Sequence, residues 1–275
     1  MDLELGEKVV MVAAASRGIG RACALAFGRE GASLSICARS AAELEATGRE
    51  IGEQTGAAVL PVPADLSRGS DIESWVERTL ERFGGVDVLV TNAGGPPSGG
   101  WHAFPSDRPW QQAFELTLLS TIRLIRAVVP AMRQRGGGRI LNIQSTSVKA
   151  PIDGLILSNT VRPGVVGLAK TLSRELASDN ILINTVTPGR VATGRLKSSL
   201  AELAQRRGAV ASLVVGVPVL GSWLLQRLAT RDIPLKRFGA PEEVADVVVF
   251  LASARASYVT GSTIAIDGGL LPSLW

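Results

Sequence analysis

Short apolar runs alternate with helix-like stretches along the first half of the chain. The runs have the length and aliphatic content of buried strands: Val9–Ala13, Ser33–Cys37, Ala58–Pro61, Val86–Val90 and Ile140–Ile143. The stretches between them carry apolar residues at helical spacing: Ile19–Glu30, Ala41–Thr55, Ser70–Phe83 and Trp110–Gln134. Strands that alternate with helices predict a parallel sheet covered on both faces, which is a doubly wound α/β fold.

The second half continues the pattern to the end of the chain. We expect a helix after Pro163, a strand at Ile181–Val186, a helix over Pro241–Ala252 and a last strand at Thr263–Ile266. There is no internal repeat and no low-complexity tail, so the pattern predicts one domain over residues 1–275. Hydrophobic residues make up 46% of the chain, which is enough for a single large core.

Charge and cysteine content exclude several classes of protein. The formal net charge is +4, and the basic residues are scattered rather than clustered, which disfavours nucleic-acid binding. The two isolated cysteines, Cys23 and Cys37, form neither a disulfide framework nor a zinc motif, so we predict no metal site and a cytoplasmic location. The acidic N-terminus lacks the apolar core of a signal peptide.

The longest uncharged apolar run covers residues 209–225 and contains Gly216, Pro218 and Gly221. Its 17 residues reach only the short limit of a membrane span. Because helix breakers interrupt it, we expect no membrane span here but a lid or a subunit contact, and the sequence does not choose between these two.

A turn of small residues joins the first expected strand to the first expected helix. Backbone amides at a helix N-terminus favour a pyrophosphate, so we predict dinucleotide contacts from Ala14, Ser16, Arg17, Gly18, Ile19 and Gly20. Arg39 follows the second expected strand, where no carboxylate occurs before Glu43. An arginine at this place suits the 2′-phosphate of NADP(H), so NADP(H) is predicted in preference to NAD(H).

Together with later motifs, this turn resembles the short-chain dehydrogenase/reductase family. The later motifs are Thr91-Asn92-Ala93-Gly94, Ser145 and Pro188-Gly189-Arg190-Val191-Ala192-Thr193. The resemblance covers nearly the whole chain and implies a Rossmann-type fold and a homo-oligomer, tetramer or dimer, built through Trp110–Gln134. It also implies cofactor contacts from Asp65, Leu66, Asn92, Ala93, Gly94, Arg162, Pro188, Gly189, Val191 and Thr193. One departure is that Ala13-Ala14 replace the family's Thr-Gly at the start of the turn.

The family's proton-transfer residues are mostly replaced. The resemblance places its serine at Ser145, but Ser158 stands for the tyrosine, Arg162 for the lysine and Thr117 for the helix asparagine. A serine hydroxyl is a far weaker acid than a phenol, and arginine keeps its charge without giving up a proton. We therefore expect water to be the proton source, with Ser158 and His102 as other candidates.

Two further features bear on this site. Pro163 directly follows Arg162, and because a residue before proline is biased away from helical geometry, we expect the helix to kink at Pro163 or to begin later. The only tyrosine, Tyr258, lies in a segment that resembles the family's C-terminal turn, so we expect it to be structural.

These features predict an NADP(H)-dependent oxidoreductase that interconverts a carbonyl and an alcohol, similar to a 3-oxoacyl reductase, with an altered proton relay. An enlarged lid is expected at residues 194–233, and its apolar content suggests a bulky hydrophobic substrate. The alternative is a catalytically inactive NADP(H)-binding sensor or regulatory protein on the same fold. The retained Ser145 favours the enzyme, whereas the missing tyrosine favours the binding protein.

Overall fold

Seven parallel strands form one sheet in the order β3-β2-β1-β4-β5-β6-β7. The computed structural model describes residues 2–194, 196 and 227–273. The strands are β1 Val9–Val12, β2 Ser33–Ala38, β3 Val59–Pro63, β4 Val88–Thr91, β5 Gly138–Ile143, β6 Ile181–Pro188 and β7 Thr263–Ile266. The doubly wound α/β fold predicted from the alternation is confirmed.

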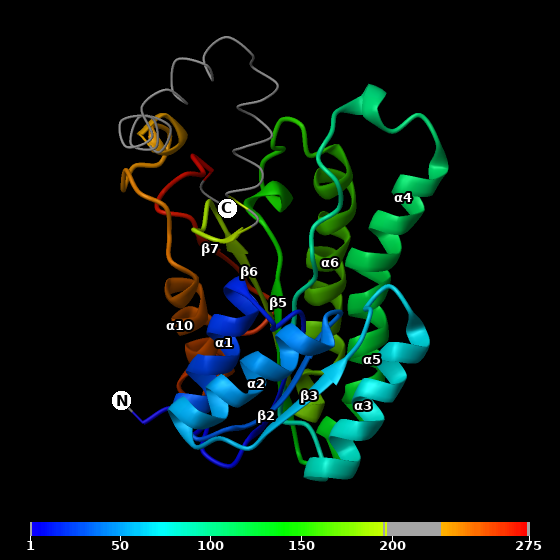
Figure 1. Ribbon diagram of the computed structural model, residues 1–275, viewed down its shortest axis with the longest axis vertical. Coiled ribbons are helices and arrows are strands. Elements are labelled where there is room, and N and C mark those ends of the chain that lie inside the picture. The colour runs from blue at the N-terminus through cyan, green and yellow to red at the C-terminus, as the bar shows by residue number, and fades with distance from the viewer. Residues whose placement is uncertain (1, 195, 197–226, 274–275) are drawn as a thin grey trace.

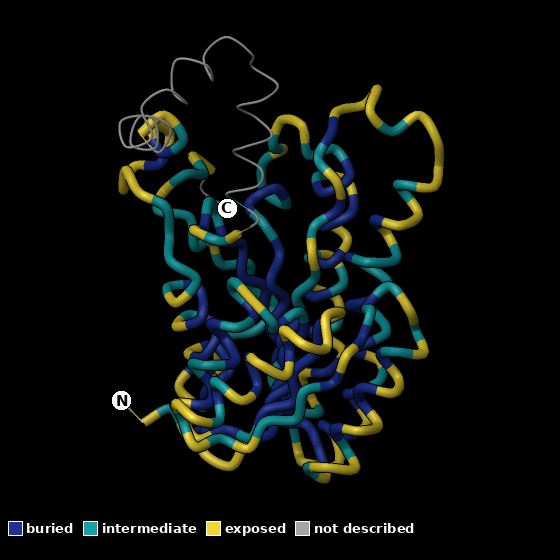
Figure 2. Tube along the Cα trace, viewed as in Figure 1, coloured by how far each residue is buried: buried dark blue, intermediate teal, exposed yellow. Residues whose placement is uncertain are grey.

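Helices cover both faces of the sheet (Figure 1). Helices α1 Gly18–Arg29, α2 Ala41–Thr55 and α10 Pro241–Ala252 lie on one face, and α3 Gly69–Phe83, α5 Ser120–Gln134 and α6 Ile156–Glu175 lie on the other. Each face has its own apolar core. Phe27 of α1 is fully buried in the first core and Trp75 of α3 in the second. The buried residues concentrate on the strands between these helices (Figure 2).

The stretch Trp110–Gln134, expected as one long helix, is three consecutive segments. Helix α4 covers Asp107–Phe114, a π-helical segment covers Glu115–Leu119, and α5 follows directly. Single π-helical turns inside α-helices often occur at functional sites, and the residue predicted to replace the family's asparagine, Thr117, lies within this one.

The helix expected after Pro163 begins earlier than predicted. Helix α6 starts at Ile156 and runs through Pro163 to Glu175, so the expectation of a later start is wrong. A proline inside a helix lacks the N–H that would bond the carbonyl four residues back, here that of Asn159. Packing overrides this local preference, because Leu157, Val161 and Val165 on the same helix are all buried.

Candidate active site

The motifs singled out in the sequence meet at one edge of the sheet. The turn containing Ala14 follows β1, Asn92 follows β4, Ser145 follows β5 and Gly189 follows β6. Parallel strands all end at the same edge, and the strand order reverses between β1 and β4. A crevice at such a reversal, outside the carboxyl ends of the strands, is where open α/β sheets bind ligands.

The turn after β1 has the close packing that a pyrophosphate site needs. A Cβ placed on Gly20 would lie 2.3 Å from the carbonyl oxygen of Ala14, so helix α1 approaches the turn more closely than any side chain allows. Gly18 has a positive φ of 59°, and Arg17 is the exposed N-cap of α1. Ser16 is tied to α2, since its carbonyl accepts a bond of 3.1 Å from the Thr47 hydroxyl. These residues fit a phosphate group held by backbone amides.

Ala14 adopts a left-handed backbone conformation, with φ of 51°. This conformation costs an L-residue roughly 1–2 kcal/mol, whereas glycine adopts it freely. We expect Ala14→Gly to raise the free energy of unfolding by up to about 1 kcal/mol, because the relief of strain exceeds the added entropy of the unfolded chain. Urea unfolding measures the difference, and a lower midpoint for the variant would contradict it.

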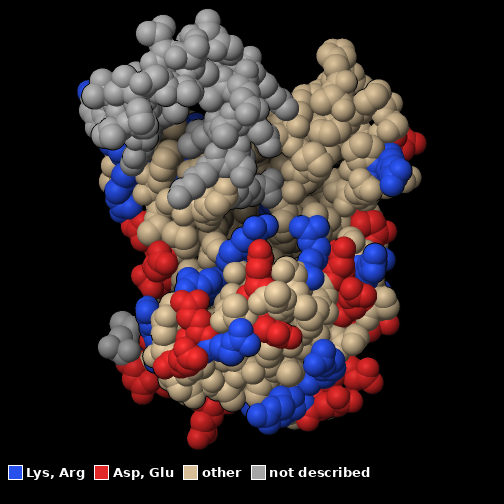
Figure 3. Space-filling view, viewed as in Figure 1, with Lys and Arg blue, Asp and Glu red and all other residues tan. Residues whose placement is uncertain are grey.

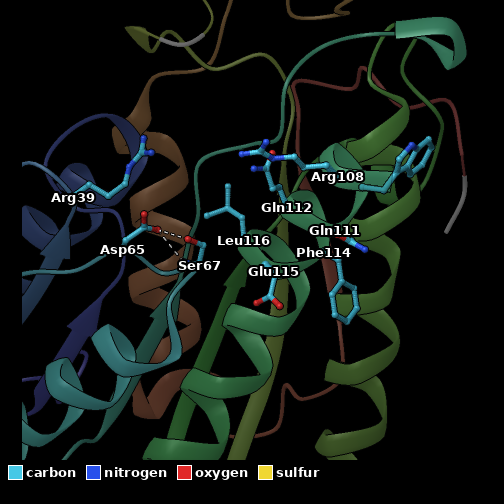
Figure 4. A pocket seen from close by; sticks show the side chains of 10 residues that line it. Arg39, Asp65, Ser67, Arg108, Gln111, Gln112, Phe114, Glu115 and Leu116 are labelled. Atoms are coloured by element: carbon cyan, nitrogen blue, oxygen red, sulfur yellow. Dashed lines mark hydrogen bonds between the residues drawn. The ribbon is translucent and has the colours of Figure 1, made fainter. Parts of the chain in front are cut away.

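The predicted adenine end of the site lies at a pocket of about 930 Å³. Figure 4 shows Arg39 and Asp65 on one side of this pocket and Arg108 and Gln112, from the segment that leads into the π-helical turn, on the other. Leu66 is buried beside Asp65. Arg108, Gln112 and Leu116 line the opposite wall and were not predicted from the sequence, because only the tertiary fold brings α4 and the π-helical segment opposite Arg39 and Asp65.

Asp65 is held as a carboxylate at this pocket. Partial burial favours its neutral form, but the Ser67 backbone N–H at 3.0 Å, the Ser67 hydroxyl at 2.8 Å and the charges of Arg39 and Arg68 outweigh that effect. The pKa of Asp65 is therefore lowered below its usual value.

Basic side chains also gather across the middle of the face shown in Figure 3, beside the hollow in that face.

Three of the four residues predicted for catalysis come from the end of β5 and from α6. Arg162 donates from Nε to the Ser158 hydroxyl at 3.0 Å, and its Nη1 donates to the Gln144 side-chain oxygen at 3.1 Å. Ser147 Oγ lies 3.3 Å from Ser158 Oγ, and the Ser147 backbone N–H donates to Ser145 Oγ at 3.2 Å. Ser145 therefore connects to Ser158 and Arg162 through Ser147, and the four groups form one cluster together with Gln144.

Gln144 and Ser147 were not predicted from the sequence. Both are buried next to Ser145 in the chain. The only available signal was their position beside the serine motif, since neither residue type is specific for this chemistry. The i to i+4 spacing of Ser158 and Arg162 places both on one face of α6, which Pro163 does not disrupt.

No hydrogen bond among the described residues joins Thr117 to this cluster. Its hydroxyl is buried and has no hydrogen-bond partner among the described residues. Its backbone carbonyl accepts a bond of 3.0 Å from Thr121. A buried hydroxyl without a partner is uncommon and indicates a place where water or ligand completes the hydrogen bonding.

The candidate acid His102 and the only tyrosine, which was expected to be structural, are both exposed. Tyr258 is fully exposed after a short 3-10 helix near the C-terminus, and His102 is exposed in the 3-10 helix Trp101–Ala103. No hydrogen bond within the described part of the chain ties either residue to Ser145, Ser158 or Arg162.

The segment after β6 folds back toward the phosphate turn. A Cβ placed on Gly18 would lie 3.4 Å from a methyl group of Thr193. Pro188 ends β6, Gly189 packs so tightly on Asp267 that a Cβ would lie 2.8 Å from its Cα atom, and Val191 forms a bridge with Gly239. After β4, the partly exposed Asn92 and Ala93 and the exposed Gly94 leave the same edge of the sheet. The predicted cofactor motifs thus lie at one edge of the sheet, and their contacts with a cofactor stay a prediction.

Residues 8–204 match the family model described as short chain dehydrogenase. The chain belongs to this family. A second model, described as enoyl-(acyl carrier protein) reductase, matches residues 219–271 of this short-chain dehydrogenase.

Relatives with similar sequences and structures cover 97% or more of this short-chain dehydrogenase. The 3-oxoacyl-[acyl-carrier-protein] reductase of Thermotoga maritima is 32% identical over 98% of this chain and 100% of its own. L-sorbose reductase from Gluconobacter frateurii, solved with NADPH and L-sorbose, is 35% identical with a TM-score of 0.91, and the match covers 100% of both chains. A variant of actinorhodin polyketide ketoreductase solved with NADPH is 32% identical with a TM-score of 0.88, over 97% of this chain and 98% of its own.

Two predictions fall mainly on residues that the structure does not describe. The apolar run 209–225 lies outside the described residues, and so does most of the lid expected at 194–233. Within the described ranges, no helix combines the length and the apolar character needed to cross a membrane.

Proposed function

We propose that this short-chain dehydrogenase is an NADP(H)-dependent oxidoreductase that interconverts a carbonyl and an alcohol without a tyrosine acid. The observation that carries the proposal is the buried cluster of Ser158, Arg162, Gln144 and Ser147, joined to Ser145 at the same sheet edge as the phosphate turn. A site that had only lost its function would have no reason to keep an arginine 7% exposed and hydrogen-bonded.

The cofactor proposal rests on Arg39 and Arg17. Arg39 lines the pocket beside Asp65, and Arg17 is the N-cap residue of α1, in the turn after β1. Two solved relatives are complexes with NADPH, as their descriptions state. When bound, NADPH supplies a hydride, and the residues of the chain bind and orient the reactants.

The hydroxyl groups of the cluster have defined directions. Ser145 Oγ accepts from the Ser147 backbone N–H, so its own hydrogen is available to a substrate carbonyl oxygen. Ser158 Oγ accepts from Arg162, so its hydrogen also points away from the guanidinium. Arg162 supplies a fixed positive charge that stabilises negative charge developing on that oxygen. The proton comes from water in this proposal, because neither serine nor arginine is a useful acid.

The second candidate function is an NADP(H)-binding sensor or regulatory protein. It is favoured by the absence of an acid from the cluster and by the Thr117 hydroxyl, which has no partner among the described residues. Both candidate functions predict that the protein binds NADP(H), but only the oxidoreductase is expected to turn over a substrate.

NADPH oxidation by the purified protein against hydrophobic ketones, 3-oxoacyl thioesters and quinones, with NADH in parallel, tests the proposal. We expect turnover of at least one class, which Ser145→Ala lowers about a hundredfold. If no substrate of the panel supports NADPH oxidation while the protein still binds NADPH tightly, the second candidate, the NADP(H)-binding protein, is the function supported. Failure to bind NADPH would contradict both functions.

Cofactor choice gives a separate prediction. We expect Arg39→Ala to weaken NADPH binding about tenfold or more and to leave NADH binding nearly unchanged, because only NADPH carries the 2′-phosphate. The dissociation constants are measured by fluorescence titration. Arg49→Ala is the matched control, since Arg49 is an exposed arginine of α2 that does not line the pocket beside Asp65. If Arg39→Ala weakens the binding of NADPH and of NADH by the same factor, Arg39 does not bind the 2′-phosphate.

Three further proposals concern the substrate, the oligomeric state and the location of the protein. The bulky hydrophobic substrate rests on the composition of residues 194–233, and its assignment as lid or subunit contact awaits mutation of that segment. A homo-oligomer through the α4–α5 region is supported by the exposed Phe114, and size-exclusion chromatography with light scattering tests it. The cytoplasmic location stays a prediction from the two isolated cysteines.

A further inference from the structure

The connecting loop, residues 149–155, joins two parts of the polar cluster. It begins after the 3-10 helix Thr146–Val148, which carries Ser147, and it ends where α6 begins at Ile156. The Ser147 and Ser158 hydroxyl oxygens lie 3.3 Å apart, so they face each other from the two ends of this loop. The conformation of the connecting loop therefore sets the position of one hydroxyl relative to the other.

Asn159 closes the connecting loop with both polar atoms of its side chain. Its Oδ1 accepts from the Ile152 backbone N–H at 3.2 Å, and its Nδ2 donates to the Ile152 carbonyl at 2.9 Å. Two residues of antiparallel strands exchange a pair of bonds in the same way, and such a pair fixes the direction of the backbone as well as its position. Asn159 directly follows Ser158 in the first turn of α6, so the loop is tied to the helix beside that hydroxyl.

The segment that follows β4 is paired with the connecting loop. Within it, Gly99 forms a parallel bridge with Leu155. The Gly99 N–H donates to the Gly154 carbonyl at 2.6 Å, and the Gly99 carbonyl accepts from the Ile156 N–H at 3.2 Å. The second bond satisfies one of the amides that a helix leaves unpaired at its N-terminus, which supports the start of α6 at Ile156. The two segments lie side by side beyond the carboxyl ends of the strands (Figure 1).

Apolar packing also holds the segment around Gly99 against α6. A Cβ on Gly99 would lie 2.7 Å from the Ala103 Cβ and 2.8 Å from the Phe104 ring, so this segment packs closely on itself. Phe104 in turn packs against the small core that contains Leu157 of α6. The segment after β4, the connecting loop and the first turn of α6 thus form one packed unit, in which Asn159 supplies the side-chain bonds.

We propose that Asn159 is a positioning residue, which holds the connecting loop against α6 and thereby fixes Ser158 relative to Ser147. Asn159 acts through Ser158, since both polar atoms of its own side chain bond Ile152. The inference rests on the proposed function, which uses the Ser158 hydroxyl at the reacting carbonyl. It deepens that function by assigning the placement of this hydroxyl to a residue outside the predicted site.

Steady-state kinetics of Asn159→Ala, on the substrate that the NADPH panel identifies, test the inference. We expect kcat to fall about tenfold, because small displacements of a catalytic group are costly, and the dissociation constant of NADPH to stay unchanged. Asn159→Asp is expected to lose as much, since a carboxylate accepts from the Ile152 N–H but cannot donate to the Ile152 carbonyl. The matched control is Thr160→Ala, at the next and exposed position of α6, where the hydroxyl bonds the Ile156 carbonyl of the same helix at 2.9 Å. This control should have the kcat of the wild type.

Amide hydrogen exchange reports the state of the connecting loop without any turnover. In Asn159→Ala the Ile152 N–H loses its acceptor, and the Gly99 N–H bonds a loop that is no longer tied to α6. We expect both amides to exchange about tenfold faster than in the wild type. Thr160→Ala should leave both exchange rates unchanged.

The outcomes separate positioning from a role in stability alone. If Asn159→Ala lowers the unfolding midpoint but keeps the wild-type kcat in the protein that remains folded, the inference is overturned. Unchanged exchange at Ile152 and Gly99 overturns it as well. Both of these results leave the proposed function intact, because the wild type turns over its substrate. A wild type that binds NADPH and turns over no substrate overturns this inference together with the proposed function.

Discussion

Replacing Arg162 by alanine is expected to lower kcat about a hundredfold to a thousandfold on the substrate that the NADPH panel identifies. The loss is the size found when one group that stabilises a developing oxyanion is removed. Arg162 is the charged member of the cluster among the described residues, and its removal also takes away the donor that bonds the buried Gln144 oxygen and the Ser158 hydroxyl. Steady-state kinetics at saturating NADPH measure the change.

Arg162→Lys separates the effect of the positive charge from the effect of the planar guanidinium shape. Lysine keeps the positive charge but presents one compact ammonium in place of a planar group, so it cannot make both bonds in the same directions. We expect it to recover part of the activity lost in Arg162→Ala. Turnover of Arg162→Ala within a few-fold of the wild type, with the fold intact by circular dichroism, would mean that the cluster has no part in the reaction.

Replacing Gly20 by alanine is expected to abolish measurable NADPH binding and to destabilise the fold. The added Cβ would lie 2.3 Å from the Ala14 carbonyl oxygen and 3.1 Å from that of Ala13, and both atoms belong to the backbone. The turn must therefore move away from α1, which displaces the amides predicted to hold the pyrophosphate. Overpacking of this kind costs about 1–3 kcal/mol of unfolding free energy. Urea unfolding and NADPH titration measure the two effects.

Gly167→Ala is the matched control for that substitution. Gly167 is an exposed residue of α6 whose Cβ would meet no atom within 4 Å. Alanine in a helix interior is favoured over glycine, so this variant is expected to gain about 0.5–1 kcal/mol and to bind NADPH like the wild type. Normal NADPH binding by Gly20→Ala would show that the turn does not hold the pyrophosphate.

The sequence predicted the sheet well because local signals agree with the tertiary structure there. Each of the seven expected strands is present, and helices α2 and α10 have the predicted bounds. Buried parallel strands are continuous aliphatic runs, and these stand out against the amphipathic helices that separate them. The sequence also indicated a tight turn after the first strand, and only glycine fits the close approach at Gly20. The pyrophosphate contacts expected at this turn stay a prediction.

Two local signals misled the sequence analysis. Pro163 was expected to delay the start of a helix or to kink it. The later start is wrong, since α6 begins at Ile156 and includes Pro163, because the buried face of α6 contributes more than one lost backbone bond; the kink stays a prediction. The stretch Trp110–Gln134 was expected as one helix, and the π-helical turn around Thr117 left no mark in the spacing of apolar residues.

The sequence alone determined the fold class and the family, because these depend on periodicity and on motifs that are local in the chain. It also predicted which catalytic positions are substituted. Only the tertiary structure decided how those positions interact. Gln144 and Arg162 are 18 residues apart and belong to different elements, and their contact exists only because α6 packs on the sheet beside the end of β5. A contact between distant residues depends on packing that no local pattern encodes, which is why the arrangement of the cluster had to come from the fold.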